Sequence, residues 1–452
     1  MPSVYDFVTW EPLLRVLRAA NPVPDSYLAG PGYLAGQLEP GGWSLPLPSE
    51  FPPPGQDRLR GELNNAVQKI LGALTEDGLD DISFVAEPAP APGGRTVLHL
   101  LTSGPSVDGG TGPYPGALIL VEGAIPEPWR RLPEPMPGAV PARTANPGML
   151  ERTLRERLPE VIGATDAELS GAEARLGIAL PEELAALYRA IRPRWQEWDD
   201  TTARRVSDAL GVELLSLEGL TIADPASREC DWQFAASEAV VTPPDAAVQG
   251  LVGSPGWITF AHDDFGDLYA VDLTPGPRGH VGQVIMLSHE HNIGATLIAE
   301  SLTDLIVHRR RSEDPSQPED QLPVVAYVNR RGLPSVAAAA HPELEVLSIG
   351  VRSGEPLSLA AVAGSPRLRT LTVNNPGTLA DPREIAELTG LEFLELPPED
   401  WRVLLDAEAV PKGLSAARIV HFGWHPLQIA ALANEILGRW GRPPIIQTTV
   451  EA

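Results

Sequence analysis

The chain has 452 residues, 43% of them hydrophobic, and a formal net charge of -26. This composition predicts about three globular domains, each with its own core, and the acidic excess argues against a nucleic-acid partner, because phosphate binding needs a basic face. A lone cysteine, Cys230, excludes an internal disulfide, and because neither a signal peptide nor an apolar run of roughly 20 residues is present, we expect a cytoplasmic protein without a membrane partner.

Residues 1–135 predict a small α+β domain whose role the sequence does not assign. Apolar side chains recur at helical spacing from Leu59 to Leu74, which indicates an amphipathic helix. Three later segments have the composition of strands: 82–87, 96–101 and 117–121. The closely spaced prolines of residues 136–150 predict a linker, because proline interrupts regular hydrogen-bond ladders.

Residues 151–311 predict two helices followed by a hairpin. Thr165 and Glu168 have the spacing of a capping box, and Gly177 is suited to end the helix that this box begins. The second helix follows Pro181 and has one apolar stripe: Leu184, Leu187, Tyr188 and Ile191. Farther along, two alternating segments within residues 256–273 flank a turn that contains Asp263, Asp264 and Gly266. Asp and Gly favour tight turns, so a hairpin is predicted.

The order of these elements resembles the SUKH superfamily over roughly residues 158–310. Four segments carry the resemblance: GIALPEELAALYRAI, WITFAHDDFGDLYAVDL, GQVIMLSHEH and LIAESLTDLIVHRR. The superfamily includes fungal cell-wall assembly regulators and bacterial immunity proteins that neutralise toxins. The resemblance implies a compact α+β domain in which helices pack on a twisted sheet, and it implies binding rather than catalysis. An insertion-like segment, RWQEWDDTTARR, departs from the usual pattern, so partner specificity does not carry over.

Residues 312–322 predict a charged linker, and residues 323–452 contain a repeat. A Leu-x-x-Leu pattern begins at Leu344, Leu368 and Leu391, with spacings of 24 and 23 residues. These spacings lie within the range of leucine-rich repeats, which this segment resembles, and a final helix is expected to cap the stack. The predicted fold class is therefore multidomain α+β: a central SUKH-like sheet with packed helices and a short C-terminal leucine-rich-repeat-like α/β array.

Histidines and carboxylates near the hairpin make the strongest case for an enzyme: His262, Asp263, Asp264, Asp267, His289 and His291. On a strand, His289 and His291 would face the same side, where nearby carboxylates could help them hold a divalent metal. Two histidines without a third ligand at a fixed spacing are not a metal motif, and the sequence contains no phosphate-binding loop or nucleophile-elbow motif. We therefore expect no enzyme, no bound metal and no cofactor, and metal-dependent hydrolysis ranks third.

Aromatic residues beside carboxylates make a stronger case for protein binding, because this composition suits a hot spot against a basic partner. The candidate residues are Trp195, Trp198, Asp199, Asp200, Asp264, Asp267 and Tyr269. In the alternative interpretation the tryptophans are core residues at a helix end, and the acids are solvated or shape the turn. We predict an immunity protein that binds and neutralises a cognate bacterial toxin, whose binding domain would be basic. The alternative function is a scaffold or regulatory adaptor that recruits its partner through the repeats.

Overall fold

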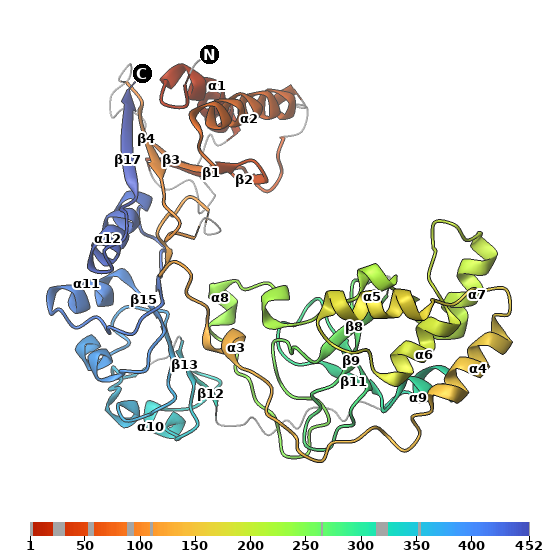
Figure 1. The fold of residues 1–452 in the computed structure, drawn as a ribbon. Helices are drawn as coiled ribbons and strands as arrows, with labels where there is room; N and C mark the ends of the chain where they lie inside the picture. The colour runs from red at the N-terminus through yellow and green to blue at the C-terminus, as the bar shows by residue number, and fades with distance from the viewer. Residues whose placement is uncertain are drawn as a thin grey trace. The chain divides into compact units, whose positions relative to one another are not determined.

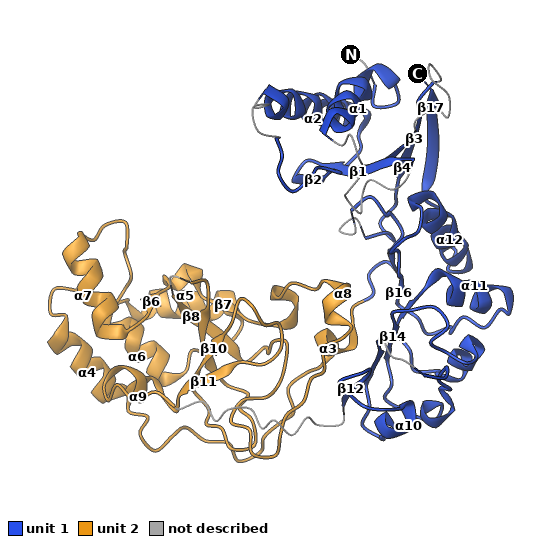
Figure 2. Ribbon diagram, turned by 180° about the vertical axis from the view of Figure 1, so that it is seen from behind, with its two compact units in different colours: residues 1–124, 323–452 blue, residues 125–322 orange. Residues whose placement is uncertain are grey.

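The structure is a computed structural model of the 452-residue chain, and it describes residues 3–20, 32–52, 58–87, 95–108, 112–263, 265–312, 324–350 and 354–451. Contacts divide the chain into two compact units (Figure 2). One unit joins residues 1–124 to residues 323–452, and the other comprises residues 125–322. The fold class is α+β, as predicted, with antiparallel and parallel sheets. The division into three domains and two linkers stays a prediction.

The 125–322 unit contains one antiparallel sheet with strand order β11-β10-β9-β8-β6, and β7 also pairs with β8. Its strands are β6 (Glu213–Leu214), β7 (Thr221–Ile222), β8 (Trp257–His262), β9 (Leu268–Asp272), β10 (Gln283–Leu287) and β11 (Thr296–Ala299). The pairing of β8 with β9 confirms the predicted hairpin and sets Trp257 opposite Asp272. Side chains of β9 enter two different hydrophobic clusters, so both faces of this sheet are covered.

Helices accompany this sheet along the chain (Figure 1): α3 (Glu127–Arg130), α4 (Pro147–Arg157), α5 (Asp166–Leu176), α6 (Glu182–Ala190), α7 (Asp200–Leu210), α8 (Trp232–Ala235) and α9 (Leu302–Ile306). Helix α5 begins with the predicted capping box, in which the Thr165 amide donates to Glu168 Oε2 at 2.8 Å and the Glu168 amide donates to Thr165 Oγ1 at 3.3 Å. It ends at Gly177, whose φ of 71° is left-handed, as expected of a helix C-terminus. Helices α4, α5, α6, α7 and α9 share one core with the sheet, whereas α3 and α8 contribute to a separate small cluster.

The N-terminal part of the other unit is a sheet with order β17-β4-β3-β1-β2. Its elements are α1 (Phe7–Ala20), β1 (Leu34–Glu39), β2 (Gly42–Ser44), α2 (Arg58–Asp77), β3 (Ile82–Glu87), β4 (Val97–Thr102) and β17 (Ile446–Glu451). The stripe from Leu59 to Leu74 lies on α2, whose buried residues pack with α1 against the strands. Strand β17 comes from the end of the described chain and pairs antiparallel with β4.

A sheet with order β12-β13-β14-β15-β16-β5 forms the rest of this unit. Its strands are β12 (Val325–Val328), β13 (Val346–Ile349), β14 (Thr370–Val373), β15 (Phe393–Leu396), β16 (Ala416–Ile419) and the antiparallel β5 (Leu118–Leu120). Strands β12 to β16 are parallel, with Leu347, Leu371 and Leu394 in register and buried. The connections contain α10 (Val336–Ala339), η4 (Ala360–Val362), η5 (Pro382–Glu387), α11 (Pro398–Asp406) and, after β16, α12 (Pro426–Arg439). The leucine-rich-repeat assignment stays a prediction.

None of the helices in the described ranges has the length and apolar character needed to cross a bilayer.

Candidate functional site

The turn between β8 and β9 is an ordered loop that projects one aromatic side chain. Asp263 Oδ1 accepts from the amides of Phe265 at 2.9 Å and Asp267 at 3.1 Å, and the Asp263 amide donates to the carbonyl of Asp267 at 3.1 Å. Gly266 has a φ of +96°, which other residues rarely adopt. The Phe265 side chain is 81% exposed.

The turn is bonded to the loop that follows β10. Asp267 Oδ1 accepts from the His289 amide at 3.0 Å and pairs with His289 Nδ1 at 2.8 Å. These two hydrogen bonds hold the pKa of Asp267 below its usual value, and the bond from Asp267 raises the pKa of His289. Arg228 anchors the same loop by donating to the carbonyls of Ser288 at 3.3 Å and of His291. The acidic turn and the His289 loop are therefore joined by hydrogen bonds and form one continuous surface.

The opposite end of the hairpin is buried. The Asp272 carboxylate accepts from Trp257 Nε1 at 3.0 Å, from the Thr274 amide at 2.7 Å and hydroxyl at 3.2 Å, and from Gln283 Nε2 at 2.8 Å. Burial outweighs these donors and raises the pKa of Asp272 to about 6. Asp272 has no access to solvent, so this cluster is a buried hydrogen-bond network that joins β8, β9 and β10 and is not a surface for a ligand.

The Trp195 to Asp200 segment forms a half-buried corner before α7. Trp195 and Trp198 meet edge to face with ring centroids 5.0 Å apart, both pack against the core, and Trp195 Nε1 donates to the carbonyl of Leu214 at 2.7 Å. Asp199 is the N-cap of α7 and accepts from the Thr202 amide at 2.7 Å, which lowers its pKa. Asp200 is exposed in the first helical turn. This placement agrees with the structural alternative weighed from the sequence.

The hairpin candidates are placed differently from one another. Asp267 is half-buried and bonded to His289, whereas Tyr269 is 5% exposed and belongs to the core, where a partner does not reach it. Asp264 lies outside the described residues. Sequence reasoning missed Phe265, although an aromatic residue between aspartates at a predicted turn has no core to enter and is a usable signal of a contact surface.

The second glutamate of the Leu-Pro-Glu-Glu-Leu segment has a structural role. Glu183 is 8% exposed, and its carboxylate accepts from the amides of Asn146 at 3.0 Å, Leu302 at 3.0 Å and Thr303 at 3.2 Å, and from the Thr303 hydroxyl. These donors include first-turn amides of α9, which have no partner inside that helix. Glu183 therefore joins α6 to α9 and to the segment before α4.

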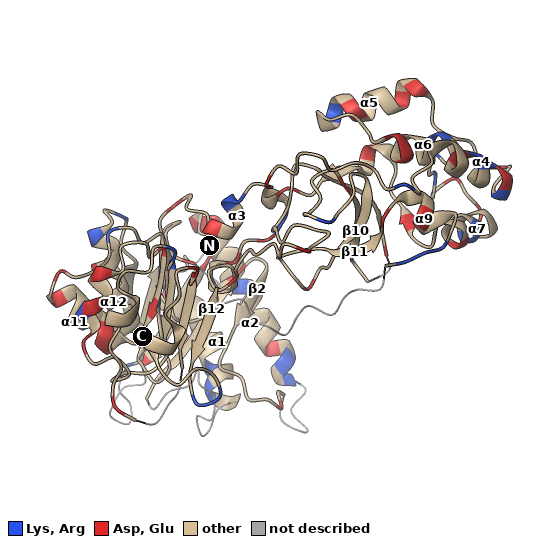
Figure 3. Ribbon diagram, turned by 90° about the horizontal axis from the view of Figure 1, so that it is seen from below, with Lys and Arg blue, Asp and Glu red and all other residues tan. Residues whose placement is uncertain are grey.

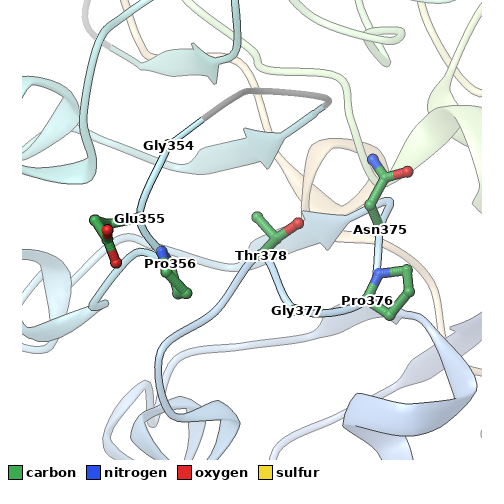
Figure 4. Close-up of a pocket in the computed structure, with 7 residues that line it drawn as sticks. All are labelled: Gly354, Glu355, Pro356, Asn375, Pro376, Gly377 and Thr378. Atoms are coloured by element: carbon green, nitrogen blue, oxygen red, sulfur yellow. The ribbon is translucent and has the colours of Figure 1, made fainter.

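The described residues contain no clustered metal ligands. Among them, no group of three His, Cys, Asp or Glu side chains is placed to hold a metal ion. A hollow of about 240 Å³ lies in the other unit, after β13 and β14 (Figure 4), and it is lined by Gly354, Glu355, Pro356, Asn375, Pro376, Gly377 and Thr378. Among the described residues of this lining, Glu355 is the one with an ionisable side chain.

Comparison with known proteins shows that residues 163–308 match the model of the SMI1 / KNR4 family (SUKH-1), which confirms the SUKH resemblance predicted for the centre of the chain. A "Glucan synthesis regulatory protein" of Neurospora crassa is 29% identical over 107 residues, which are 22% of this chain and 19% of that protein. A "Cell wall biosynthesis/cell cycle regulator smi1" of Schizosaccharomyces pombe is 29% identical over 157 residues, 32% of this chain and 30% of the relative.

A "KNR4/SMI1 homolog" of Yarrowia lipolytica is 40% identical over 75 residues, which cover 17% of this chain and 10% of that protein. The chain thus spans less than a third of the length of these three relatives. The range matched by the family model includes both the β8–β9 turn and Glu183.

Proposed function

We propose that this chain is a cytoplasmic, non-catalytic binding protein that captures a basic partner protein with the β8–β9 turn, and that this partner is a toxin which it masks. The observation that carries the proposal is Phe265, an aromatic side chain that is 81% exposed at the tip of a hydrogen-bonded acidic turn. Single exposed apolar residues are common in proteins. Phe265 differs from most of them because it lies on a turn that side-chain hydrogen bonds hold in place.

The turn is suited to binding because its shape is fixed before a partner arrives. Asp263 and Asp267 fix the backbone on both sides of Phe265, and Asp267 is further tied to His289. A contact residue on a preorganised loop loses little conformational entropy when it is buried, which increases affinity. An aromatic anchor in the centre of an interface is also a frequent hot spot.

Charge argues for a basic partner. The net charge of the chain is -26, and carboxylates flank Phe265 at positions 263 and 267, with Glu290 exposed on the adjoining loop. Over the helices, acidic and basic residues are interspersed (Figure 3). The overall excess steers a basic protein towards the chain, and the carboxylates around Phe265 favour its docking at the turn.

A second candidate function is a regulatory adaptor, and the parallel sheet favours it. Tyr327, Ser348 and Thr372 are aligned on β12, β13 and β14, and Tyr327 is 47% exposed. Aligned positions on successive parallel strands are the binding surfaces of many repeat proteins. The printed names of two fungal relatives describe regulators, which supports a non-catalytic role for the shared domain.

Capture from the native host tests the proposal, with the products of adjacent reading frames among the proteins sought. The tagged wild-type chain is compared with Phe265→Ala and with Phe422→Ala, a matched control that removes an equally prominent phenylalanine, 75% exposed, from the other unit. We expect a basic protein to be lost with Phe265→Ala alone, and its toxicity in a growth assay to be relieved by the wild type. A non-toxic partner that is lost with Tyr327→Ala would favour the adaptor.

A further inference from the structure

Strand β17 is an edge strand whose outer side no described strand covers. It is the first strand in the order β17-β4-β3-β1-β2, and its residues pair one to one with β4 from Ile446 opposite Thr102 to Glu451 opposite Val97. Figure 1 shows it running beside β4 at the margin of the sheet. An edge strand presents unpaired backbone donors and acceptors along its outer side, so it is a template for a further strand.

The sequence of β17 contains few of the features that prevent such pairing. Edge strands are commonly protected by proline, by lysine or by a bulge. The segment Ile-Gln-Thr-Thr-Val-Glu has no proline and no basic residue, its register with β4 is continuous, and its one charge is the terminal Glu451. Ile446 is 60% exposed. The strand is therefore rich in β-branched residues, open and nearly neutral.

The two faces of β17 differ. Gln447 Nε2 and Thr449 Oγ1 lie 3.0 and 3.2 Å from His99 Nδ1, which assigns these residues to one face. Side chains alternate along a strand, so Ile446, Thr448 and Val450 share the other face. Val450 packs partly against the core beneath α1 and α2. The β-branched stripe of this face thus continues the hydrophobic core to the edge of the sheet.

We propose that two copies of this chain associate through β17, antiparallel, about a two-fold axis that passes through Thr448. A two-fold axis normal to the sheet keeps each face on its own side, so one residue must lie opposite itself. With Thr448 on the axis, Ile446 lies opposite Val450 of the second copy, and this contact occurs twice. Gln447 then faces Thr449. The stripes of the two copies become one apolar surface on the helix-covered face.

The neighbouring register is less favourable. With Thr449 on the axis, Thr448 would lie opposite Val450 and Gln447 opposite Glu451, and Ile446 would have no β-branched partner. Cross-strand pairs of β-branched residues stabilise a sheet, whereas like charges that face each other destabilise it. No acid faces an acid in either register, so the two registers differ in the partner of Ile446. The Thr448 register is favoured because it sets the two most apolar residues of β17, Ile446 and Val450, opposite each other.

The strength and salt dependence of the dimer follow from its size and charge. Five paired residues on each side make a small interface, so we expect a dissociation constant on the order of micromolar. Each copy carries a net charge of -26, so mutual repulsion is strong at low salt. Added salt screens this repulsion and should tighten the dimer. Binding of a basic partner to the acidic β8–β9 turn should instead weaken as salt is added. The salt dependence therefore distinguishes dimerisation through β17 from partner binding.

Analytical ultracentrifugation of the full chain over a concentration series tests the proposal. We expect a monomer–dimer equilibrium that Thr448→Lys and Thr448→Asp each weaken at least about tenfold, because equal charges then meet on the axis. An equimolar mixture of these two variants should restore dimerisation, and Thr448→Val is the control that keeps a β-branched residue. A wild-type monomer throughout the series, or a mixture no tighter than either variant alone, would overturn the proposal.

Cross-linking gives a second readout that does not depend on charge. In a Cys230→Ser background, Thr448→Cys should form an intermolecular disulfide under mild oxidation, because residues that face each other across antiparallel strands lie within bonding range. Gln447→Cys alone should cross-link far less, since residue 447 faces residue 449, and Gln447→Cys combined with Thr449→Cys should cross-link. Equal disulfide yields from variants with a single cysteine at residue 447, 448 or 449 would contradict the register.

Discussion

Trp257 and Asp272 are cross-strand neighbours at the open end of the β8–β9 hairpin, away from the turn, and the Trp257 indole N–H donates to the Asp272 carboxylate at 3.0 Å. The opposite end of the same hairpin is the turn that projects Phe265. One end of the hairpin is thus a buried hydrogen-bond network, and the other end is an exposed contact loop. Substitutions at the two ends should therefore affect stability and binding separately.

The first prediction concerns the pH dependence of stability. Burial raises the pKa of Asp272 from its ordinary 3.8 to about 6, so the folded state holds a proton that the unfolded state releases. The resulting stabilisation is complete below about pH 4 and is lost as the pH rises through 6, and it amounts to about 3 kcal/mol. Asp272→Asn does not titrate, so it should lack this dependence. The measurement is the difference in the free energy of unfolding between wild type and variant, by urea denaturation between pH 4 and pH 7. A difference that is constant with pH would contradict the assignment.

The second prediction uses the two adjacent glutamates of α6. Glu183→Gln should destabilise the unit by about 1–3 kcal/mol, because a neutral amide is a weaker acceptor for the buried donors around it. Glu182→Gln changes the same residue type at the neighbouring, exposed position and should be nearly neutral. Urea denaturation of both variants at pH 7 gives the comparison, and equal losses would argue against the capping of α9 by Glu183.

The third prediction concerns the start of α5. Thr165→Ala removes the side chain that accepts from the Glu168 amide, and we expect a loss of about 1 kcal/mol. Thr201→Ala is a suitable control, since Thr201 is exposed in the first turn of α7, where Asp199 provides the cap. Thermal unfolding of the two variants should separate them. A control as destabilised as Thr165→Ala would show that the loss does not come from the capping box.

The fourth prediction concerns the pair that ties the turn to the loop after β10. His289 has a raised pKa, so its contribution to folding is complete below its ordinary 6.5 and is lost as the pH rises through the higher folded value. Asp267 has a lowered pKa, so its contribution is complete above its ordinary 3.8 and is lost on acidification through the lower folded value. The pair should therefore be strongest between about pH 4 and pH 6.5.

Amide exchange at His289, followed by mass spectrometry or nuclear magnetic resonance, reports on this pair. After correction for intrinsic rates, protection should be greatest in that window and decline on either side. Asp267→Asn should lose the maximum, whereas Glu290→Gln, which changes a carboxylate 4.0 Å from the same imidazole, should retain it. Protection that is independent of pH in the wild type would rule out a contribution from the ion pair.

Elements with strong local signals could be predicted from the sequence. The Thr165 capping box, the Gly177 helix end and the β8–β9 hairpin depend on contacts within a few residues, and all three are present. The spacing of Leu347, Leu371 and Leu394 likewise falls on successive parallel strands, because each repeat buries the same position. Such patterns need no knowledge of the distant parts of the chain.

Elements that depend on distant partners could not be predicted. Strand β17 is short and has only two strongly apolar residues, Ile446 and Val450, and its partner β4 lies more than three hundred residues earlier. Tyr269, a candidate for partner binding, lies in the core, because β9 is covered on both faces and alternation does not identify a solvent-facing side there. Phe265 differs from these, because the Asp263 bonds beside it are local and the sequence contains a usable signal for it.

The central claim, that the chain binds a basic protein through the β8–β9 turn, is tested most directly by quantitative capture from the native host with wild type, Phe265→Ala and Phe422→Ala in parallel. We predict that a basic protein is recovered with wild type and Phe422→Ala and is depleted at least about tenfold with Phe265→Ala, as expected when a hot-spot aromatic is truncated. Equal recovery of every partner by Phe265→Ala and Phe422→Ala would contradict the account.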